Sequence, residues 1–269
     1  MKINFSVLIL TYNEEINIER CLQPLSELDD IIVVDSFSTD KTIPLLNSYS
    51  NVRVFQRKFD DFASQRNFGL KNFGLKHPWV LHLDADEVVD KDFLEECSRL
   101  AELDEKSGYL VPSKLIFLNK WIKHASGFPV YQMRFMKIGE VEFVQVGHGQ
   151  REGNSKRGIG YMNTPYLHYN FSKGLADWFE KHNRYSTQEA QQEQKNEKDS
   201  LRHIFSSNKI LRRRALKKIS HRIPFRPFFK FCYLYFFKMG FLDGKAGFYY
   251  CQLMWLYESM IVVKKKENF

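Results

Sequence analysis

The sequence has few cysteines and no long hydrophobic run. Its four cysteines, at positions 21, 97, 232 and 251, show no Cys-x-x-Cys or Cys–His spacing. They predict reduced, mostly buried thiols in a cytosolic protein and argue against a zinc site. No window offers about 20 uninterrupted apolar residues, so we expect no conventional membrane-spanning helix. The apolar stretch 3–10 is short and precedes no small-residue cleavage site, so we expect no signal peptide.

The balance of charge favours an anionic partner. Lysine and arginine outnumber aspartate and glutamate, and the formal net charge is +8. Such an excess suits nucleic acid, a phosphorylated substrate or an acidic lipid surface. No nucleic-acid-binding motif accompanies the charge, so we do not expect a nucleic-acid partner. The apolar and charged fractions, 43% and 27%, are ordinary for a globular protein.

Residues 5–84 alternate between continuous apolar runs and amphipathic stretches. The pattern predicts strands at 5–11, 30–35, 52–55 and 79–84, with helices at 16–22, 41–49 and 62–73 between them. This alternation is typical of an α/β fold with a Rossmann-like, mostly parallel sheet flanked by helices. In such sheets, ligands bind outside the carboxyl ends of the strands.

Polar side chains end three of these predicted strands. They are Thr11 and Asn13 after the first, Asp35 after the second, and Asp84 and Asp86 after the fourth. In extended geometry the two aspartates would share one face. Two converging carboxylates repel each other, and Mg²⁺ or Mn²⁺ would relieve that repulsion. An isolated Asp-x-Asp is more often a solvated acidic turn, but three polar strand ends at one predicted edge favour a metal site.

The middle of the chain changes character after a predicted helix at 91–103. Residues 108–117 read as a strand, and 132–137 with 140–146 are expected to form a hairpin that turns at Gly139. A polar, glycine-spaced loop follows at 147–153. His148 in this loop is either a surface histidine or, if the loop packs on the acidic edge, a ligand or base. A helix is expected from 175 to 194.

The C-terminal part is basic and aromatic. Residues 202–222 contain no acid and eight lysines and arginines. Aromatic-rich segments follow at 223–237 and 246–263, and three lysines follow at 264–266. Such a composition suits helices that lie in an anionic membrane interface, with prolines and glycines preventing one straight span. The alternative is a helical pair that packs on the core and presents a solvated basic face.

Four segments follow one another in the first part of the chain: VLILTYNEE from Val7, IVVDSFSTDKT from Ile32, ASQRNFG from Ala63 and LDADE from Leu83. In order and spacing they resemble family 2 glycosyltransferases, in particular the bacterial enzymes of lipopolysaccharide-core and surface-polysaccharide assembly. Later stretches, among them LHYNFSKG and GFLDG, also look like that branch, so the resemblance spans nearly the whole chain. It implies a GT-A fold with a nucleotide-sugar-binding half at 1–107, an acceptor-binding half at 108–200 and a helical, membrane-surface-associating extension at 201–269.

The resemblance also implies roles for single residues. Thr11, Asn13 and Glu14 would frame the nucleotide base and ribose, and Asp35 would accept hydrogen bonds from them. Arg66 would lie near the base or diphosphate, and Asp84 beside the ribose. Asp86 would hold the Mg²⁺ or Mn²⁺ that neutralises the leaving nucleoside diphosphate. The expected partners are a nucleotide-sugar donor, a lipid-linked or glycan acceptor and an anionic membrane surface, at the cytoplasmic face of the cell membrane.

Family 2 enzymes invert the anomeric centre, so the resemblance implies a general base on the acceptor side. Many relatives carry a His-Glu pair there, whereas this chain has GHGQRE, with the glutamate displaced. Glu152 is the leading candidate for the base and His148 the second. A loop carboxylate paired with a neighbouring arginine is the structural alternative for Glu152.

Two other functions compete with this interpretation. A nucleotidyltransferase also uses paired carboxylates on a Rossmann-like sheet, but it would need a glycine-rich, lysine-bearing phosphate loop near the N-terminus. The stretch from Thr11 to Glu15 has neither feature. A non-catalytic scaffold of the same fold at the membrane is the second alternative. The donor sugar, the nucleotide base and the acceptor hydroxyl are not determined by the sequence.

Overall fold

The computed structural model describes residues 4–146, 149–195 and 225–267. The chain forms two compact units, one from 1–116 with 128–172 and the other from 117–127 with 173–269. The three-part division at 107 and 200 remains a prediction.

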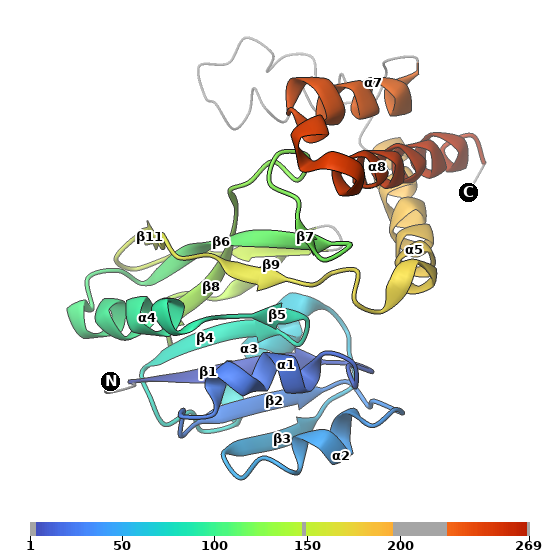
Figure 1. The fold of residues 1–269 in the computed structure, drawn as a ribbon. Coiled ribbons are helices and arrows are strands. Elements are labelled where there is room, and N and C mark those ends of the chain that lie inside the picture. The colour runs from blue at the N-terminus through green and yellow to red at the C-terminus, as the bar shows by residue number, and fades with distance from the viewer. Residues whose placement is uncertain (1–3, 147–148, 196–224, 268–269) are drawn as a thin grey trace. The chain divides into compact units, whose positions relative to one another are not determined.

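The first unit begins with the alternation that the sequence predicts. Its elements are β1 (Phe5–Thr11), α1 (Ile18–Leu22), β2 (Ile31–Asp35), α2 (Thr42–Leu46), β3 (Val52–Gln56), α3 (Phe62–Asn72) and β4 (Trp79–Asp84). The strands pair in parallel in the order β3-β2-β1-β4 (Figure 1). Thr11 lies opposite Asp35, and Leu10 lies opposite Asp84. The polar ends of β1, β2 and β4 therefore meet at one edge, as expected.

The later strands extend the same sheet. They are β5 (Glu87–Val88), β6 (Gly108–Phe117), β8 (Val130–Lys137), β11 (Ile159–Tyr161) and β12 (Tyr166–His168), with α4 (Lys91–Leu103) between β5 and β6. Beyond β4 the order is β8-β6-β12-β5, and β11 pairs with β6. The α/β prediction with a mostly parallel sheet is confirmed.

The predicted hairpin between 132–137 and 140–146 is wrong. Strand β8 lies antiparallel between β4 and β6, where its Phe135 and Met136 are fully buried. Strand β9 (Phe143–Val146) pairs instead with β10 (Gly149–Glu152), within the stretch expected to be a loop. The reason is visible in α3: the Asn67 amide donates to the Phe143 carbonyl at 2.8 Å and accepts from the Phe143 amide at 2.9 Å. These bonds hold Phe143 of β9 against α3, while β10 is the strand that pairs with β9.

Both faces of the sheet are buried. Odd-numbered residues of β1, such as Val7 and Ile9, pack with residues of α1 and α4 in one core. Leu8 and Leu10 pack on the other face with residues that include Ala63 of α3. A Cβ on Gly69 of α3 would lie 2.7 Å from the Leu8 side chain, so glycine permits the helix to approach the sheet closely. That approach places Arg66, one turn earlier, over the end of β4.

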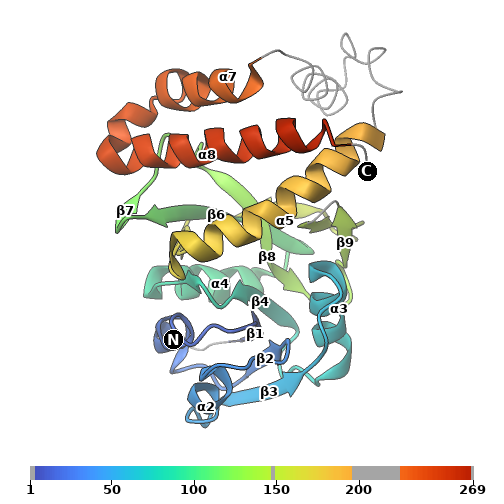
Figure 2. The same cartoon turned by 90° about the vertical axis from the view of Figure 1, so that its right-hand side faces the viewer.

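The second unit contains β7 (Lys120–Trp121), α5 (Gly174–Lys195), α7 (Arg226–Cys232), the turns η3 (Tyr233–Phe237) and η4 (Gly240–Asp243), and α8 (Gly244–Lys264). Helix α8 packs against both α5 and α7 (Figure 2). Arg226 joins the three helices through ion pairs with Glu193 at 2.9 Å and Glu258 at 2.5 Å. The predicted C-terminal helices are confirmed. Within the described ranges, no helix is long and apolar enough to cross a membrane.

Asp243 anchors the loop at 122–127 within this unit. Its carboxylate is 3% exposed and accepts from the backbone amides of Lys123, His124 and Ala125. It also lies 2.9 Å from Nδ1 of His124. Three successive amides are satisfied by one carboxylate, which explains why an acid is tolerated in an otherwise aromatic segment.

Candidate active site

The two aspartates at the end of β4 take different partners. The chain turns at Ala85 and Asp86 and starts β5 at Glu87, so the extended geometry that would place both carboxylates on one face is absent. Asp84 pairs with arginines, and Asp86 pairs with a histidine. The repulsion expected between the carboxylates is thus relieved by separate cations.

Asp84 is held by two buried arginines. Arg66 of α3 donates to Oδ1 at 2.5 Å, and Arg134 of β8 donates to Oδ2 at 2.7 Å. Arg134 also donates to the fully buried Glu87. Burial alone would raise the pKa of the Asp84 carboxyl, but the two guanidinium groups hold it below its usual value. The carboxylate therefore stays ionised, and both of its oxygens are occupied.

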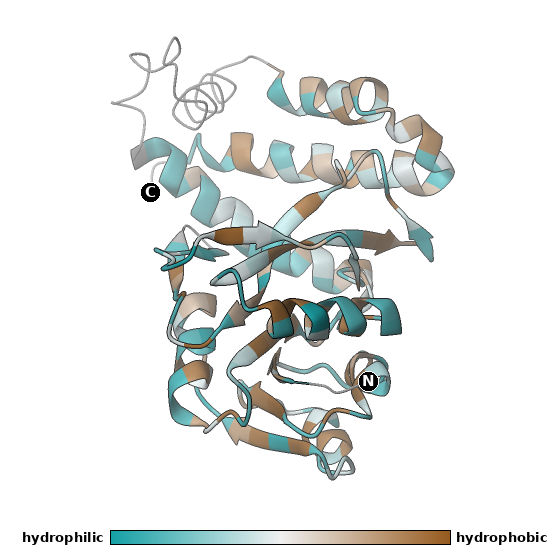
Figure 3. Ribbon diagram, turned by 90° about the vertical axis from the view of Figure 1, so that its left-hand side faces the viewer, coloured by the Kyte–Doolittle hydropathy of each residue, from teal (hydrophilic) through white to brown (hydrophobic). Residues whose placement is uncertain are grey.

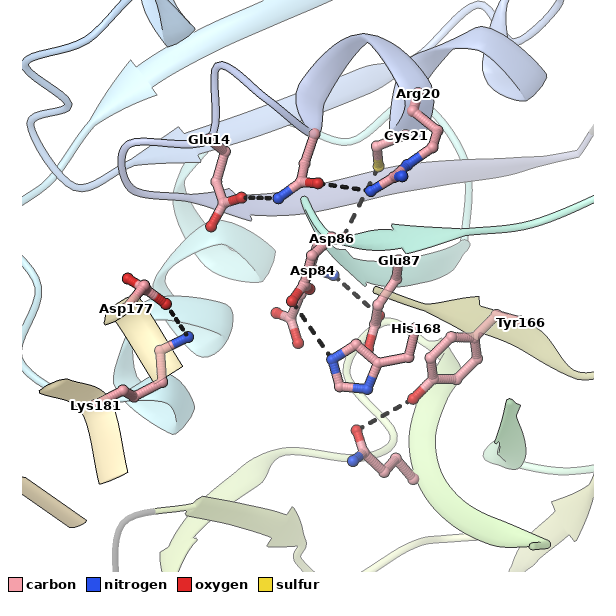
Figure 4. A network of polar contacts seen from close by, with 12 residues as sticks. Glu14, Arg20, Cys21, Asp84, Asp86, Glu87, Tyr166, His168, Asp177 and Lys181 are labelled. Carbon is pink, nitrogen blue, oxygen red and sulfur yellow. Dashed lines mark hydrogen bonds and ion pairs between the residues drawn. The ribbon is translucent and has the colours of Figure 1, made fainter. Parts of the chain in front are cut away.

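Asp86 faces His168, the last residue of β12. The imidazole Nε2 lies 3.5 Å from Asp86 Oδ2, and Figure 4 shows the two side chains turned toward each other. Burial would lower the pKa of His168, but the charge and hydrogen bond of Asp86 outweigh it and raise the pKa to about 9. The side chains are 19% and 21% exposed, so this pair is accessible from solvent. A cation thus lies beside Asp86 at neutral pH.

Backbone contacts hold this turn in place. The amide of Tyr169 donates to the Asp86 carbonyl at 2.9 Å, and the amide of Asp84 donates to Glu87 Oε2 at 3.0 Å. Arg20 of α1 stacks on the Tyr169 ring, 3.6 Å from its centroid. A chain of hydrogen bonds, drawn in Figure 4, joins Arg20 through Asn17 to Glu14. The loop after β1 and the loop after β12 are therefore coupled beside the aspartates.

The loops after β1 and β2 form one hydrogen-bonded surface around Asp35. This carboxylate is fully buried and accepts from Thr11 Oγ1 at 3.0 Å, from Gln56 Nε2 at 3.1 Å and from both the amide and the hydroxyl of Ser38. Since a carboxylate has about four acceptor positions, Asp35 is filled by the chain itself. Its predicted contact with base or ribose would require one donor to move.

The other two residues predicted for this region lie on the same surface. The Asn13 amide donates to Ser38 Oγ at 2.8 Å, and its side chain accepts from the Thr39 amide at 2.8 Å. The Glu14 amide donates to Thr42 Oγ1 at 2.7 Å. Thr11, Asn13, Glu14 and Asp35 are thus brought together, and Arg66, Asp84 and Asp86 lie together at the end of β4.

The structure describes one of the two candidates for the general base. His148 lies outside the described residues. Glu152 ends β10, opposite Phe143, and is partly buried. Two residues earlier, the Gln150 amide, turned with its oxygen toward α3, accepts from Arg66 Nε at 2.7 Å. Alternate residues of a strand share a face, so Glu152 belongs to the face of β10 that meets α3. Their catalytic roles remain predictions.

The sequence patterns did not identify three residues of this site. Glu87 stands in the LDADE motif, His168 in the resembling stretch LHYNFSKG, and Arg134 in the segment predicted as one strand of a hairpin. His168 had a usable signal, because it ends a short apolar stretch as Asp35 and Asp84 do. Arg134 had none, since an arginine among apolar residues of a strand does not reveal a carboxylate partner 50 residues earlier.

The site contains groups that could bind a cation and others that could bind an anion. In the described part of the chain, no cluster of three or more His, Cys, Asp or Glu is arranged to hold a metal. Asp86 provides a carboxylate oxygen, and His168 would add an imidazole nitrogen once a metal ion displaced its proton; this donor set suits Mn²⁺ or Mg²⁺ when other ligands come from a phosphate. Nη1 of Arg66 and Nε of Arg134 are buried without a hydrogen-bond partner. Such orphaned donors fit an anionic ligand.

The chain is similar to several known proteins. The lipopolysaccharide core biosynthesis glycosyltransferase LpsC of Rhizobium meliloti (strain 1021) is 27% identical over 198 residues, which cover 71% of this chain and 72% of LpsC. An uncharacterized glycosyltransferase of Rickettsia bellii is 31% identical over 117 residues, 43% of this chain and 39% of that protein. The crystal structure of S. aureus TarS 1–349 in complex with UDP-GlcNAc aligns over 97% of this chain and 89% of that one, with a TM-score of 0.48 and 16% identity.

A family model extends across most of the chain. The model described as glycosyl transferase family 2 matches residues 6–220. These residues include all of β1 except Phe5, the carboxyl end of β4 with Asp84 and Asp86 (the β4 edge), and β12. The α/β architecture and the mostly parallel sheet agree with the GT-A fold that the resemblance implied. The chain therefore belongs to glycosyl transferase family 2.

Proposed function

We propose that this glycosyltransferase moves a sugar, with inversion, from a UDP-sugar to a lipid-linked or polysaccharide acceptor in bacterial envelope glycan assembly. The observation that carries the proposal is that Asp84 and Asp86 have different partners at the β4 edge. Both oxygens of Asp84 accept hydrogen bonds from buried arginines, whereas the carboxylate of Asp86 faces the partly exposed His168. UDP is proposed because it is the most frequent nucleotide in this family. The name of LpsC supports an envelope glycan as the product.

The donor would lie along the edge formed by β1, β2 and β4. Its base and ribose would meet the surface made by Thr11, Asn13 and Asp35, with Asp84 at the ribose. The unpartnered guanidinium nitrogens of Arg66 and Arg134 would favour the negative charge of the diphosphate. These donors are held by Asp84 and Glu87 before any ligand arrives, so little reorganisation is needed when charge develops on the leaving group.

Asp86 and His168 are the residues that would hold Mg²⁺ or Mn²⁺. Asp84 is a poor ligand, because both of its oxygens already accept from arginines. A divalent cation bound by Asp86 supplies charge that stabilises the departing nucleoside diphosphate. Tyr169, whose amide binds the Asp86 carbonyl, keeps the turn in the orientation that this role requires.

Glu152 is proposed as the base that removes the proton from the acceptor hydroxyl. Replacing it by glutamine should lower kcat by roughly 10²–10⁴-fold, the usual contribution of general-base catalysis. Binding of UDP should be unchanged, because the amide keeps the shape of the side chain. Arg151→Gln, on the opposite face of the same strand, is the matched control and should keep its activity. Full turnover in Glu152→Gln would remove Glu152 from the mechanism.

The donor class can be tested with a thermal-shift screen of nucleoside diphosphates and nucleotide sugars, with and without Mn²⁺. A ligand that binds only the native state stabilises it by RT ln(1 + [L]/Kd), and at about a hundred times Kd the expected rise in Tm is about 5 °C. We expect the largest rise with a UDP-sugar and Mn²⁺ together. If no nucleotide gives a metal-dependent rise, the proposed function is wrong.

We also propose that the enzyme acts at the cytoplasmic face of the membrane, where nucleotide sugars are soluble and a lipid-linked acceptor is anchored. The support is the basic, aromatic composition of the C-terminal part of the sequence.

A further inference from the structure

Large apolar side chains, all but one of them aromatic, are exposed along one continuous segment of the second unit. We call them the aromatic face. Its members are Phe225, Phe228, Phe229, Tyr233, Phe236, Phe237, Phe241 and Leu242. Phe225 and Phe237 are 80% and 81% exposed, and the other six are between 45% and 57% exposed. In Figure 3 brown segments recur along α7 and at the turn between α7 and α8. This much exposed apolar surface marks an interaction site.

The spacing shows that the exposure is one-sided. Positions 225, 228, 229, 233, 236 and 237 recur every three or four residues, which places them along one side of the helical path. Leu234, on the other side, is buried, as are Cys251 and Leu253 of α8. Helix α7 is therefore already packed against α8 through its inner side. The aromatic face is what remains unpartnered after this packing.

The charges around the aromatic face have one sign. Between Phe225 and Lys264 the sequence contains only two acids, Asp243 and Glu258. Asp243 is buried against His124 and three backbone amides, and Glu258 is paired with Arg226. Lys238 and Lys245 are exposed, and the Lys238 ammonium lies 6.0 Å from the Tyr233 ring centroid. The surface thus combines exposed phenylalanines with uncompensated lysines and no free carboxylate.

We propose that the aromatic face is a monolayer-inserting surface for a bilayer rich in anionic lipids. Phenylalanines would enter the boundary between headgroups and acyl chains, while lysines on long stems reach the phosphates. The absence of a helix that can span a bilayer in the described ranges agrees with a surface mode. A second copy of the chain is disfavoured as the occupant, because two such faces would bring like charges together. The aromatic face would hold the enzyme at lipid-linked acceptors; this purpose, but not the membrane binding itself, rests on the proposed function.

Vesicle flotation of the full chain tests the proposal. The vesicles are phosphatidylcholine alone or phosphatidylcholine with phosphatidylglycerol. We expect binding to the mixed vesicles and weak binding to the neutral ones. The double variant Phe236→Ser, Phe237→Ser should reduce the partition coefficient about tenfold, and Lys238→Glu, Lys245→Glu should reduce it about as much, through charge. The matched control, Leu103→Ser with Tyr161→Ser, removes two apolar groups of the first unit that are 51% and 62% exposed and should bind as the unaltered chain does.

Two results would overturn the proposal. One is equal vesicle binding by the Phe236/Phe237 variant and the unaltered chain. The other is a concentration-dependent dimer that this variant abolishes, since a second copy would then cover the aromatic face. Each variant is also titrated with UDP and Mn²⁺. Because the altered residues lie outside the β4 edge, donor binding should persist, so a failure of docking is distinguished from a failure of the proposed glycosyl transfer.

Discussion

Replacing Asp86 by alanine is expected to lower turnover by about a thousandfold, because the proposed metal ion contributes several kcal/mol to the transition state. The fold should survive. Asp86 is partly exposed and its partner His168 can be solvated once the carboxylate is gone. The measurement is the release of nucleoside diphosphate in the presence of Mn²⁺, with the donor found by the thermal-shift screen.

The control for this variant is Glu102→Ala, which removes an exposed carboxylate from the end of α4. It should leave turnover unchanged. An Asp86→Ala enzyme with unchanged turnover would contradict the metal assignment. A non-catalytic scaffold would show no donor turnover in either protein, and its biological function would survive the Asp86 substitution.

Replacing Arg134 by leucine is expected to cost about 3–5 kcal/mol of folding free energy, the usual penalty for removing one partner of a buried ion pair. Arg134 is 3% exposed and is the cation that contacts both Asp84 and Glu87. Glu87 is fully buried, and burial raises the pKa of its carboxyl even with Arg134 present. Without the arginine its charge would be left in an apolar setting. Urea denaturation followed by circular dichroism measures the loss.

A double-variant cycle separates the charge effect from lost packing. Adding Glu87→Gln to Arg134→Leu removes the orphaned charge and should recover part of the stability, so the two effects should not be additive. Arg134→Lys keeps the charge and should be milder than leucine. If the changes in unfolding free energy caused by the Arg134 and Glu87 substitutions are strictly additive, the two residues are not energetically coupled.

The sheet edge was predictable from local patterns, and its cross-chain partners were not. Apolar runs that end in Thr11, Asp35 and Asp84 mark parallel strands whose carboxyl ends meet, and the register of β1 with β2 and β4 places them there. Arg134, the second partner of Asp84, comes from β8, and His168, the partner of Asp86, comes from β12. Their positions depend on the order of strands across the sheet, which periodicity does not encode.

The surroundings of three acids, Asp35, Asp84 and Asp86, show a second limit of sequence patterns. Asp35 was expected to face a ligand, yet four donors of its own chain surround it. Whether a strand-end carboxylate is filled internally depends on the loop that follows it, here the turn at Ser38. The extended geometry expected for Asp84 and Asp86 is absent, because β5 begins at Glu87 and the connection must turn.

The central claim is that Asp86 with His168, and not Asp84, forms the metal-binding part of the donor site. Calorimetric titration of UDP with and without Mn²⁺ tests it most directly, in the unaltered chain and in Asp86→Asn and His168→Gln. In the unaltered chain, Mn²⁺ should tighten UDP binding at least about tenfold. In Asp86→Asn, affinity should no longer depend on Mn²⁺, while weak binding through Arg66 and Arg134 persists; His168→Gln should lie between. An undiminished effect of Mn²⁺ in Asp86→Asn would contradict the account.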